Sequence, residues 1–82
     1  SMVVKYIQAH KKGKYLGLKN IKMLKNKKKV FYFKTIAKKN SQVDITQHNA
    51  ARLATFACYD KTLKLATKKA NLIESKVKPI II

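Results

Sequence analysis

The chain has 82 residues, a length that fits one domain with a modest core and leaves little room for an enclosed active site. Its 20 Lys and Arg residues against three Asp and Glu residues give a formal net charge of +17, which excludes a neutral enzyme of ordinary composition and indicates a polyanion as partner. Hydrophobic residues make up 46% of the chain, a share typical of globular proteins rather than of disordered basic tails.

The chain offers few groups for catalysis or metal binding. Its only acidic residues are Asp44, Asp60 and Glu74, which argues against a carboxylate mechanism. The single cysteine, Cys58, excludes an internal disulfide, and the two histidines lack the spacing of metal ligands. No apolar run approaches the roughly 18 residues of a membrane span. We therefore expect neither an enzyme, nor a metal or cofactor site, nor a membrane protein.

The first half of the chain predicts strands. Residues 3–7 predict either a first strand or an arm that packs on the domain. Residues 18–24, 30–36 and 42–45 then predict a three-stranded antiparallel meander, whose strands are separated by polar turns rich in Lys and Asn. The strongest strand is 30–36, because it is β-branched and aromatic throughout.

A helix is predicted to begin at Thr46, a residue suited to an N-cap position. Five small or apolar side chains follow on one stripe at helical spacing: Ala50, Leu53, Ala54, Ala57 and Cys58. This face would pack closely against the sheet. Pro79 bars regular helix near the end of the chain.

A second stripe of the same predicted helix carries larger side chains: Arg52, Phe56, Tyr59 and Leu63. One sheet cannot cover both faces of a helix. We therefore expect Phe56, Tyr59 and Leu63 to pack on the N-terminal arm or the C-terminal tail, or to form the interface of a homodimer.

Together these elements predict an α+β fold, with a three-stranded antiparallel sheet packed against one long C-terminal helix and an N-terminal strand or arm. Residues 1–14 would form the arm, residues 15–73 the sheet-plus-helix domain, and residues 74–82 a tail. Ser1-Met2 resembles the remnant of a removed tag, which indicates a fragment excised from a longer protein.

Two segments of the predicted helix, 46–54 (TQHNAARLA) and 58–61 (CYDK), resemble the helix of the Apetala-two-type DNA-binding domain of plant ethylene-response factors and apicomplexan transcription regulators. The stretch 69–72 (KANL) is similar to the closing stretch of that family, and Gly17-Leu18 to the pair that opens its first strand. The resemblance covers about residues 15–73. The family's Trp in the second strand is missing, and its Arg-rich strands are Lys-rich here.

The resemblance implies sequence-specific binding of double-stranded DNA by a sheet inserted into the major groove. The chain would then be the DNA-binding module of a transcription regulator in the nucleus. Its bias toward Lys, Asn and Ile is similar to that of the apicomplexan branch of the family.

Strand alternation indicates which side chains of the second strand would face the DNA. If Phe31 and Phe33 point toward the helix, then Val30, Tyr32, Lys34 and Ile36 point outward. We expect Tyr32 and Lys34 to contact bases or phosphates, and Lys34 is suited to guanine. The opposite strand parity is left open.

In the first predicted strand, Ile21 and Met23 would point inward, which leaves Asn20 and Lys22 outward. Asn20 is suited to reading adenine and Lys22 to reading guanine. Four lysines of the following hairpin would hold phosphates and set the register on DNA: Lys25, Lys27, Lys28 and Lys29.

Two other nucleic-acid readings stay open. A structural RNA-binding protein of ribosomal type explains the charge and the size equally well, and in that case Tyr32 would stack on a base. The arm-type DNA-binding domain of tyrosine recombinases shares the plan of a sheet followed by a helix.

Overall fold

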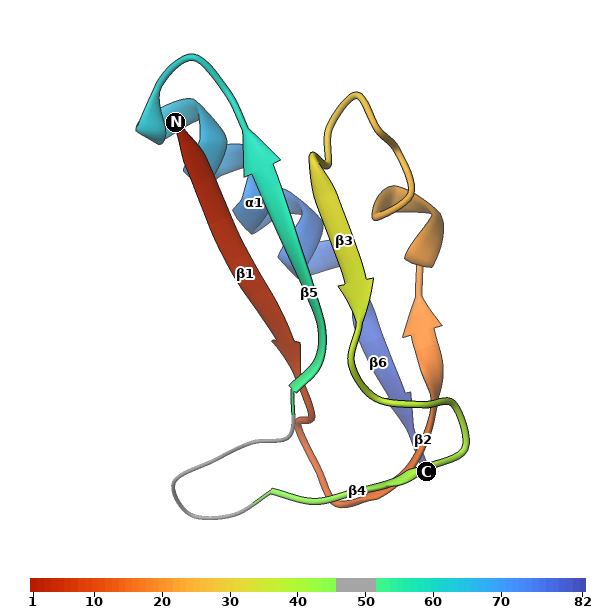
Figure 1. The fold of residues 1–82 in the computed structure, drawn as a ribbon. Coiled ribbons are helices and arrows are strands. Elements are labelled where there is room, and N and C mark those ends of the chain that lie inside the picture. The colour runs from red at the N-terminus through yellow and green to blue at the C-terminus, as the bar shows by residue number, and fades with distance from the viewer. Residues whose placement is uncertain (46–51) are drawn as a thin grey trace.

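The computed structural model describes residues 1–45 and 52–82. Within these residues the chain forms six strands, one α-helix and a short 3-10 helix, η1 (Figure 1). Their order is β1 (Met2–Gln8), β2 (Gly13–Lys19), η1 (Ile21–Met23), β3 (Tyr32–Thr35), β4 (Gln42–Val43), β5 (Arg52–Tyr59), α1 (Leu63–Lys76) and β6 (Lys78–Ile81). The fold is α+β with its helix near the C-terminus, which confirms the predicted class.

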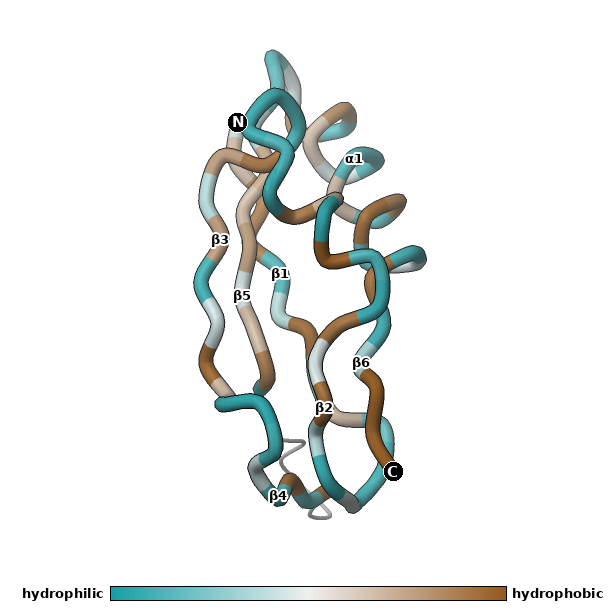
Figure 2. Tube along the Cα trace, turned by 90° about the vertical axis from the view of Figure 1, so that its right-hand side faces the viewer, coloured by the Kyte–Doolittle hydropathy of each residue, from teal (hydrophilic) through white to brown (hydrophobic). Residues whose placement is uncertain are grey.

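The strands form two small antiparallel sheets, where the sequence predicted one. The first sheet has the order β1-β5-β3, and the second has the order β4-β2-β6. Figure 1 shows β1, β5 and β3 side by side with α1 behind them, and Figure 2 shows the same layers from the side. The helix packs against β1 and β5 and so covers one face of the first sheet.

The central strand β5 occupies residues that the sequence predicted to be helical. The predicted helical stripe is wrong here, because Leu53, Ala54, Phe56, Ala57 and Cys58 are all buried in a strand with neighbours on both edges. A short, continuous apolar run is equally compatible with a buried strand and with a buried helix. Long-range pairing with β1 and β3 decides between them. The predicted N-cap Thr46 and the stripe residue Ala50 lie outside the described residues.

The helix begins instead after Thr62, whose hydroxyl Oγ1 accepts a hydrogen bond from Leu65 N at 3.2 Å. Its buried residues are Ala66, Ala70 and Ile73, at i, i+4 and i+7. Small side chains at the first two positions let the helix approach the sheet closely. The helix ends before the extended β6, in keeping with the expectation from Pro79.

The other strands agree with the predictions to different degrees. β1 confirms the strand alternative for residues 3–7, while β3 and β4 confirm the second and third strands in shorter form. The predicted strand at 18–24 is wrong beyond Lys19. Asn20 adopts a left-handed conformation, with φ of 62°, and turns the chain into η1. Residues assigned to the arm and the tail supply β1 and β6.

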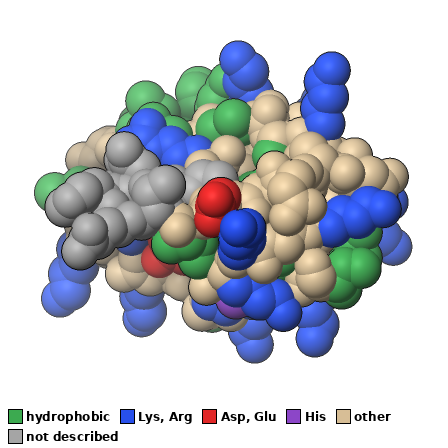
Figure 3. Space-filling view, turned by 90° about the horizontal axis from the view of Figure 1, so that it is seen from below, with side chains coloured by type: hydrophobic (Ala, Val, Ile, Leu, Met, Phe, Trp, Pro, Cys, Tyr) green, Lys and Arg blue, Asp and Glu red, His purple; other side chains and the backbone are tan. Residues whose placement is uncertain are grey.

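The core lies between the helix and the two sheets. Its largest fully buried side chains are Phe56, Leu24, Leu53, Ile73, Val77 and Cys58. No polar or charged side chain is buried anywhere in the described part of the chain. Lysines therefore project from the surface, as Figure 3 shows for the lower end of the molecule.

Candidate nucleic-acid interface

The face of the β1-β5-β3 sheet that points away from α1 carries no covering element among the described residues (Figure 2). We call it the outer face. Strand register places Val4, Ala57 and Tyr32 in one row across it. Tyr6, Thr55 and Lys34 form the next row.

Exposed apolar and aromatic side chains dominate the outer face. Tyr6 and Tyr32 are 40% and 47% exposed, and Phe31 beside them is 72% exposed. They belong to a shallow groove of about 660 Å³, whose other lining residues are Met2, Val4, Lys34, Ile36, Thr55 and Ala57. Among the described residues that line this groove, none is acidic. A contiguous exposed apolar patch of this kind marks an interaction surface.

Arg52, the chain's single arginine, lies on this face. Its guanidinium carbon is 4.2 Å from the centroid of the Tyr6 ring, in cation–π geometry. The ring supports the flat guanidinium at the start of β5, so this group presents both a plane and a positive charge beside the groove.

The lysine turn, residues 25–29, adjoins the opposite end of the outer face. Lys27, Lys28 and Lys29 share a small pocket with Phe31 and Tyr59. The turn is fixed by local hydrogen bonds, including one from Val30 N to Asn26 O at 2.8 Å, and Phe31 N donates to Ala57 O at 2.8 Å. Because of these bonds, three cations stand next to two exposed aromatic rings.

The predicted inward and outward directions of the side chains in the second strand are right within β3 and wrong for the two residues before it. Tyr32, Lys34 and Ile36 are exposed, and Phe33 packs partly against the core, as predicted. Val30, expected outward, is only 4% exposed, and Phe31, expected inward, is exposed. The reason is that β3 begins only at Tyr32, so strand alternation does not apply to the two residues before it.

Asn20 and Lys22 are not on a strand and do not join Tyr32 and Lys34. Asn20 Nδ2 donates to Lys76 O at 2.9 Å, which ties the turn after β2 to the end of α1. Ile21 and Met23 pack partly against the core, as predicted, but from η1. The structure thus brings together Tyr32, Lys34 and the lysine turn, and it separates Asn20 and Lys22 from them.

The proposed dimer or arm-packing stripe does not exist as one face. Phe56 is fully buried in the core, because it points inward from β5. Tyr59 is exposed at the end of β5, and Leu63 is exposed at the start of α1. Of these three residues, Tyr59 alone lies beside the groove, next to the lysine turn.

Two of the three acidic residues are paired with lysines, and neither of them lines the groove. Lys5 Nζ and Glu74 Oε1 are 3.6 Å apart, and Lys69 Nζ and Asp60 Oδ2 are 3.2 Å apart. A hydrogen bond from Lys61 N and the Lys69 ammonium hold the pKa of Asp60 below its usual value. The lysine partners of these carboxylates are thus other residues than Lys34 and the lysines of the turn.

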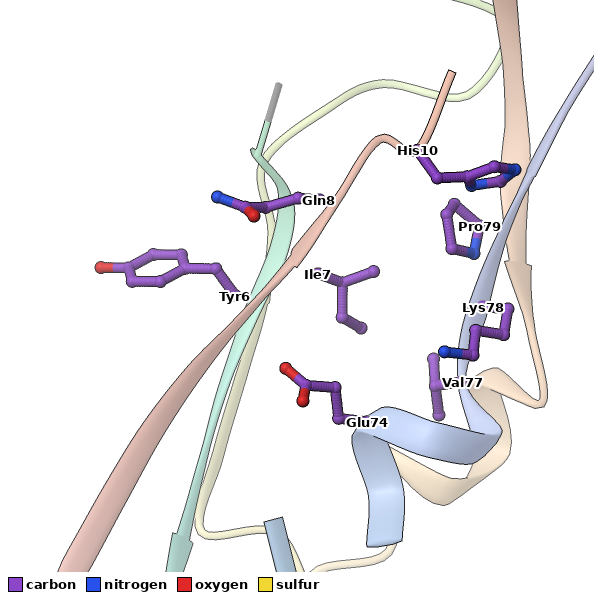
Figure 4. A pocket seen from close by; sticks show the side chains of 8 residues that line it. All are labelled: Tyr6, Ile7, Gln8, His10, Glu74, Val77, Lys78 and Pro79. Atoms are coloured by element: carbon purple, nitrogen blue, oxygen red, sulfur yellow. The ribbon is translucent and has the colours of Figure 1, made fainter. Parts of the chain in front are cut away.

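A second cavity, of about 500 Å³, lies between β1 and the end of α1. Figure 4 shows Glu74 pointing toward Ile7, while Tyr6 and Gln8 project from the other side of β1. His10 lies beside Pro79 (Figure 4). The described residues hold no cluster of three or more side chains suited to a metal ion. Burial raises the pKa of the Cys58 thiol, so this cysteine is not an activated nucleophile.

The sequence assigns Tyr6 to a first strand or a packed arm, and Arg52 to a helix, so it does not predict either as a member of the site. Their partnership depends on the pairing of β1 with β5, which joins residues about 50 positions apart. Val4, Tyr6 and Gln8 are exposed in the structure and alternate with partly buried or buried residues, but hydropathy does not signal this face, because Val4 points outward and Lys5 is partly buried.

Comparison of the chain with protein-family models, with curated proteins and with solved structures finds no match. The resemblance to the Apetala-two-type domain therefore stays a prediction. No helix in the described ranges is long and apolar enough to cross a membrane.

Proposed function

We propose that this chain binds nucleic acid through the outer face and the adjoining lysine turn. The observation that carries the proposal is the joint placement of exposed aromatic rings, Lys34, Arg52 and the lysine turn around a groove whose described lining has no acidic residue. Phosphates are attracted by clustered lysines, while an open sheet face can meet bases.

Double-stranded DNA, bound in the major groove, is the target that the family resemblance implies. A β-sheet fits that groove, and Tyr32 and Lys34 are exposed on the strand expected to face the bases. Action as a transcription-regulator module in the nucleus belongs to the same prediction. RNA is the other target of this surface, and neither target needs a cofactor.

The test compares two charge-matched double variants of the chain. Lys27→Ala/Lys28→Ala removes two cations beside the outer face, and Lys64→Ala/Lys76→Ala removes two exposed lysines from α1, which lies behind the first sheet (Figure 1). Fluorescence anisotropy at about 100 mM salt would measure binding to a labelled 20-mer, single-stranded and duplex. We expect the first variant to bind about tenfold more weakly and the second to change little, because only contacted phosphates release counterions.

Equal losses in both variants would show that the positive charge acts diffusely, and the outer face would lose its role. An absence of measurable binding by the unsubstituted chain would overturn the proposed function altogether. Circular dichroism of each variant would check that the substitutions leave the fold intact.

A further inference from the structure

We infer that the outer face binds unpaired bases, so that the preferred ligand is single-stranded nucleic acid whose bases stack on Tyr32, on Phe31 and on the Arg52–Tyr6 pair. This inference rests on the proposed function and names its substrate class. It depends on the shape of the face, on the shortage of polar groups there, and on the position of the cations.

The shape comes from the sizes of side chains in two neighbouring rows. In the centre, β5 contributes the small residues Ala57 and Thr55, and the edge strands contribute Tyr32 and Tyr6. Small residues on the middle strand keep the centre of the face low, and the two rings stand on opposite edge strands in different rows. Neighbouring strands are about 4.8 Å apart, so roughly 10 Å separates the two edge strands. A flat base can therefore stack against either ring.

Apart from Lys34 and Arg52, few groups on this face are suited to reading base edges in a duplex. The row of Val4, Ala57 and Tyr32 offers one polar group, the phenol. The Thr55 hydroxyl already donates to Lys5 O at 3.1 Å. Reading in the major groove depends on hydrogen bonds to base edges. Stacking needs only accessible rings and an unpaired base, because every base has an aromatic face.

Cations stand at both ends of the groove. Arg52 lies at the first residue of β5, stacked on Tyr6, and the lysine turn lies near Tyr59, the last residue of β5. The strand between them has eight residues and spans about 26 Å at roughly 3.3 Å per residue. A strand of several nucleotides can thus place bases over the groove and phosphates against positive charge at each end.

The outer face differs from exposed apolar side chains elsewhere on the molecule because it combines aromatic rings with cations. Leu72 on α1 is 52% exposed but carries no aromatic group, and it lies on the other side of the sheet from the outer face. It therefore provides a matched control: an exposed apolar side chain that the inference leaves without a role in binding.

The experiment measures binding of the chain to fluorescein-labelled dT15, rU15 and a 15-base-pair duplex at about 150 mM salt. We expect both single strands to bind at least about tenfold more tightly than the duplex; comparing dT15 with rU15 tells DNA from RNA. Tyr32→Ala should weaken single-strand binding about 5- to 100-fold, the range that stacking on one ring supplies. Tyr32→Phe should keep most of the affinity, since the ring remains. Leu72→Ala should bind like the unsubstituted chain.

Duplex binding as tight as single-strand binding, with Tyr32→Ala without effect, would overturn this inference and leave the proposed function standing. Absence of binding to all three probes would overturn both. Sedimentation equilibrium measures the oligomeric state of the chain and of Tyr32→Ala. If the unsubstituted chain is a dimer and Tyr32→Ala is a monomer, the outer face serves self-association, and the inference is overturned.

Discussion

At the scale of single residues, the contact of Arg52 with Tyr6 places a planar cation beside the groove that we propose binds nucleic acid. An exposed cation–π pair contributes about 0.5–1 kcal/mol, too little to define the fold of a domain. It does fix the orientation of the guanidinium beside the groove. A planar cation can then stack with a base or meet a phosphate with two donors, which a lysine cannot do.

Asp60 supplies a pH prediction at the same scale. Its carboxylate Oδ1 accepts from Lys61 N at 2.7 Å, and Oδ2 pairs with Lys69. These contacts lower its pKa in the folded state below the ordinary value of 3.8. A depressed folded pKa stabilises the protein at pH values above the unfolded pKa, and this contribution disappears as the pH falls through the folded pKa.

We therefore expect Asp60→Asn to unfold at a lower urea concentration than the unsubstituted chain at pH 6. The difference should shrink steadily below pH 4 and vanish at the acid end, where the carboxylate of the parent chain is protonated as well. Urea titrations followed by circular dichroism from pH 6 to pH 2 measure this. A difference that stays constant with pH would mean that the ion pair with Lys69 contributes nothing to stability.

At the scale of elements, the close approach of β2 to the last residue of the chain makes Gly13 essential. Its φ is +154°, and a Cβ added there would lie 2.3 Å from Ile82 O. Lys14 and Ile82 exchange two backbone hydrogen bonds at the same place, 2.9 and 3.1 Å long. A side chain at position 13 would therefore push the two segments apart.

Gly17→Ala is the matched comparison for Gly13→Ala. Gly17 also has a positive φ, +126°, but a Cβ added there would lie 3.9 Å from its nearest neighbour, the side-chain carbon Cε of Lys39. We expect Gly17→Ala to cost about 1–3 kcal/mol for backbone strain alone. Gly13→Ala should cost about 1–3 kcal/mol more from the steric clash. Equilibrium urea unfolding measures both, and equal costs would contradict a close approach at Gly13.

The elements also explain how far sequence reasoning could reach. β1 and β3 were predictable because β-branched and aromatic residues are local signals, and Tyr32 and Lys34 followed from β3. β5 was not, since its apolar run gives no period and its identity depends on pairing with strands distant in sequence. The same long-range pairing creates the outer face. The sequence alone therefore could not predict that Tyr6, Arg52 and Tyr32 lie together on the outer face.

At the scale of the whole molecule, the net charge of +17 and the outer face act over different distances. Total charge attracts any polyanion and speeds encounter, while contacts at one surface fix the bound register. Five cations lie on or beside the outer face: Lys27, Lys28, Lys29, Lys34 and Arg52. They are a minority of the 20 basic residues. The number of phosphates neutralised on binding therefore tells attraction by the whole charge from contacts at the outer face.

The slope of log affinity against log salt concentration counts the phosphates that the chain neutralises. Five contacts predict a slope of about −3.5 for a single strand and about −4.5 for a duplex. Between 50 and 200 mM salt, single-strand binding should then weaken by roughly 130-fold. Anisotropy titrations with dT15 at five salt concentrations measure the slope, and each lysine removed from the turn at 25–29 should reduce it by about 0.7. A much steeper slope, unaffected by those substitutions, would mean that lysines all around the molecule share the phosphates, and the bound strand would then have no fixed path across the outer face.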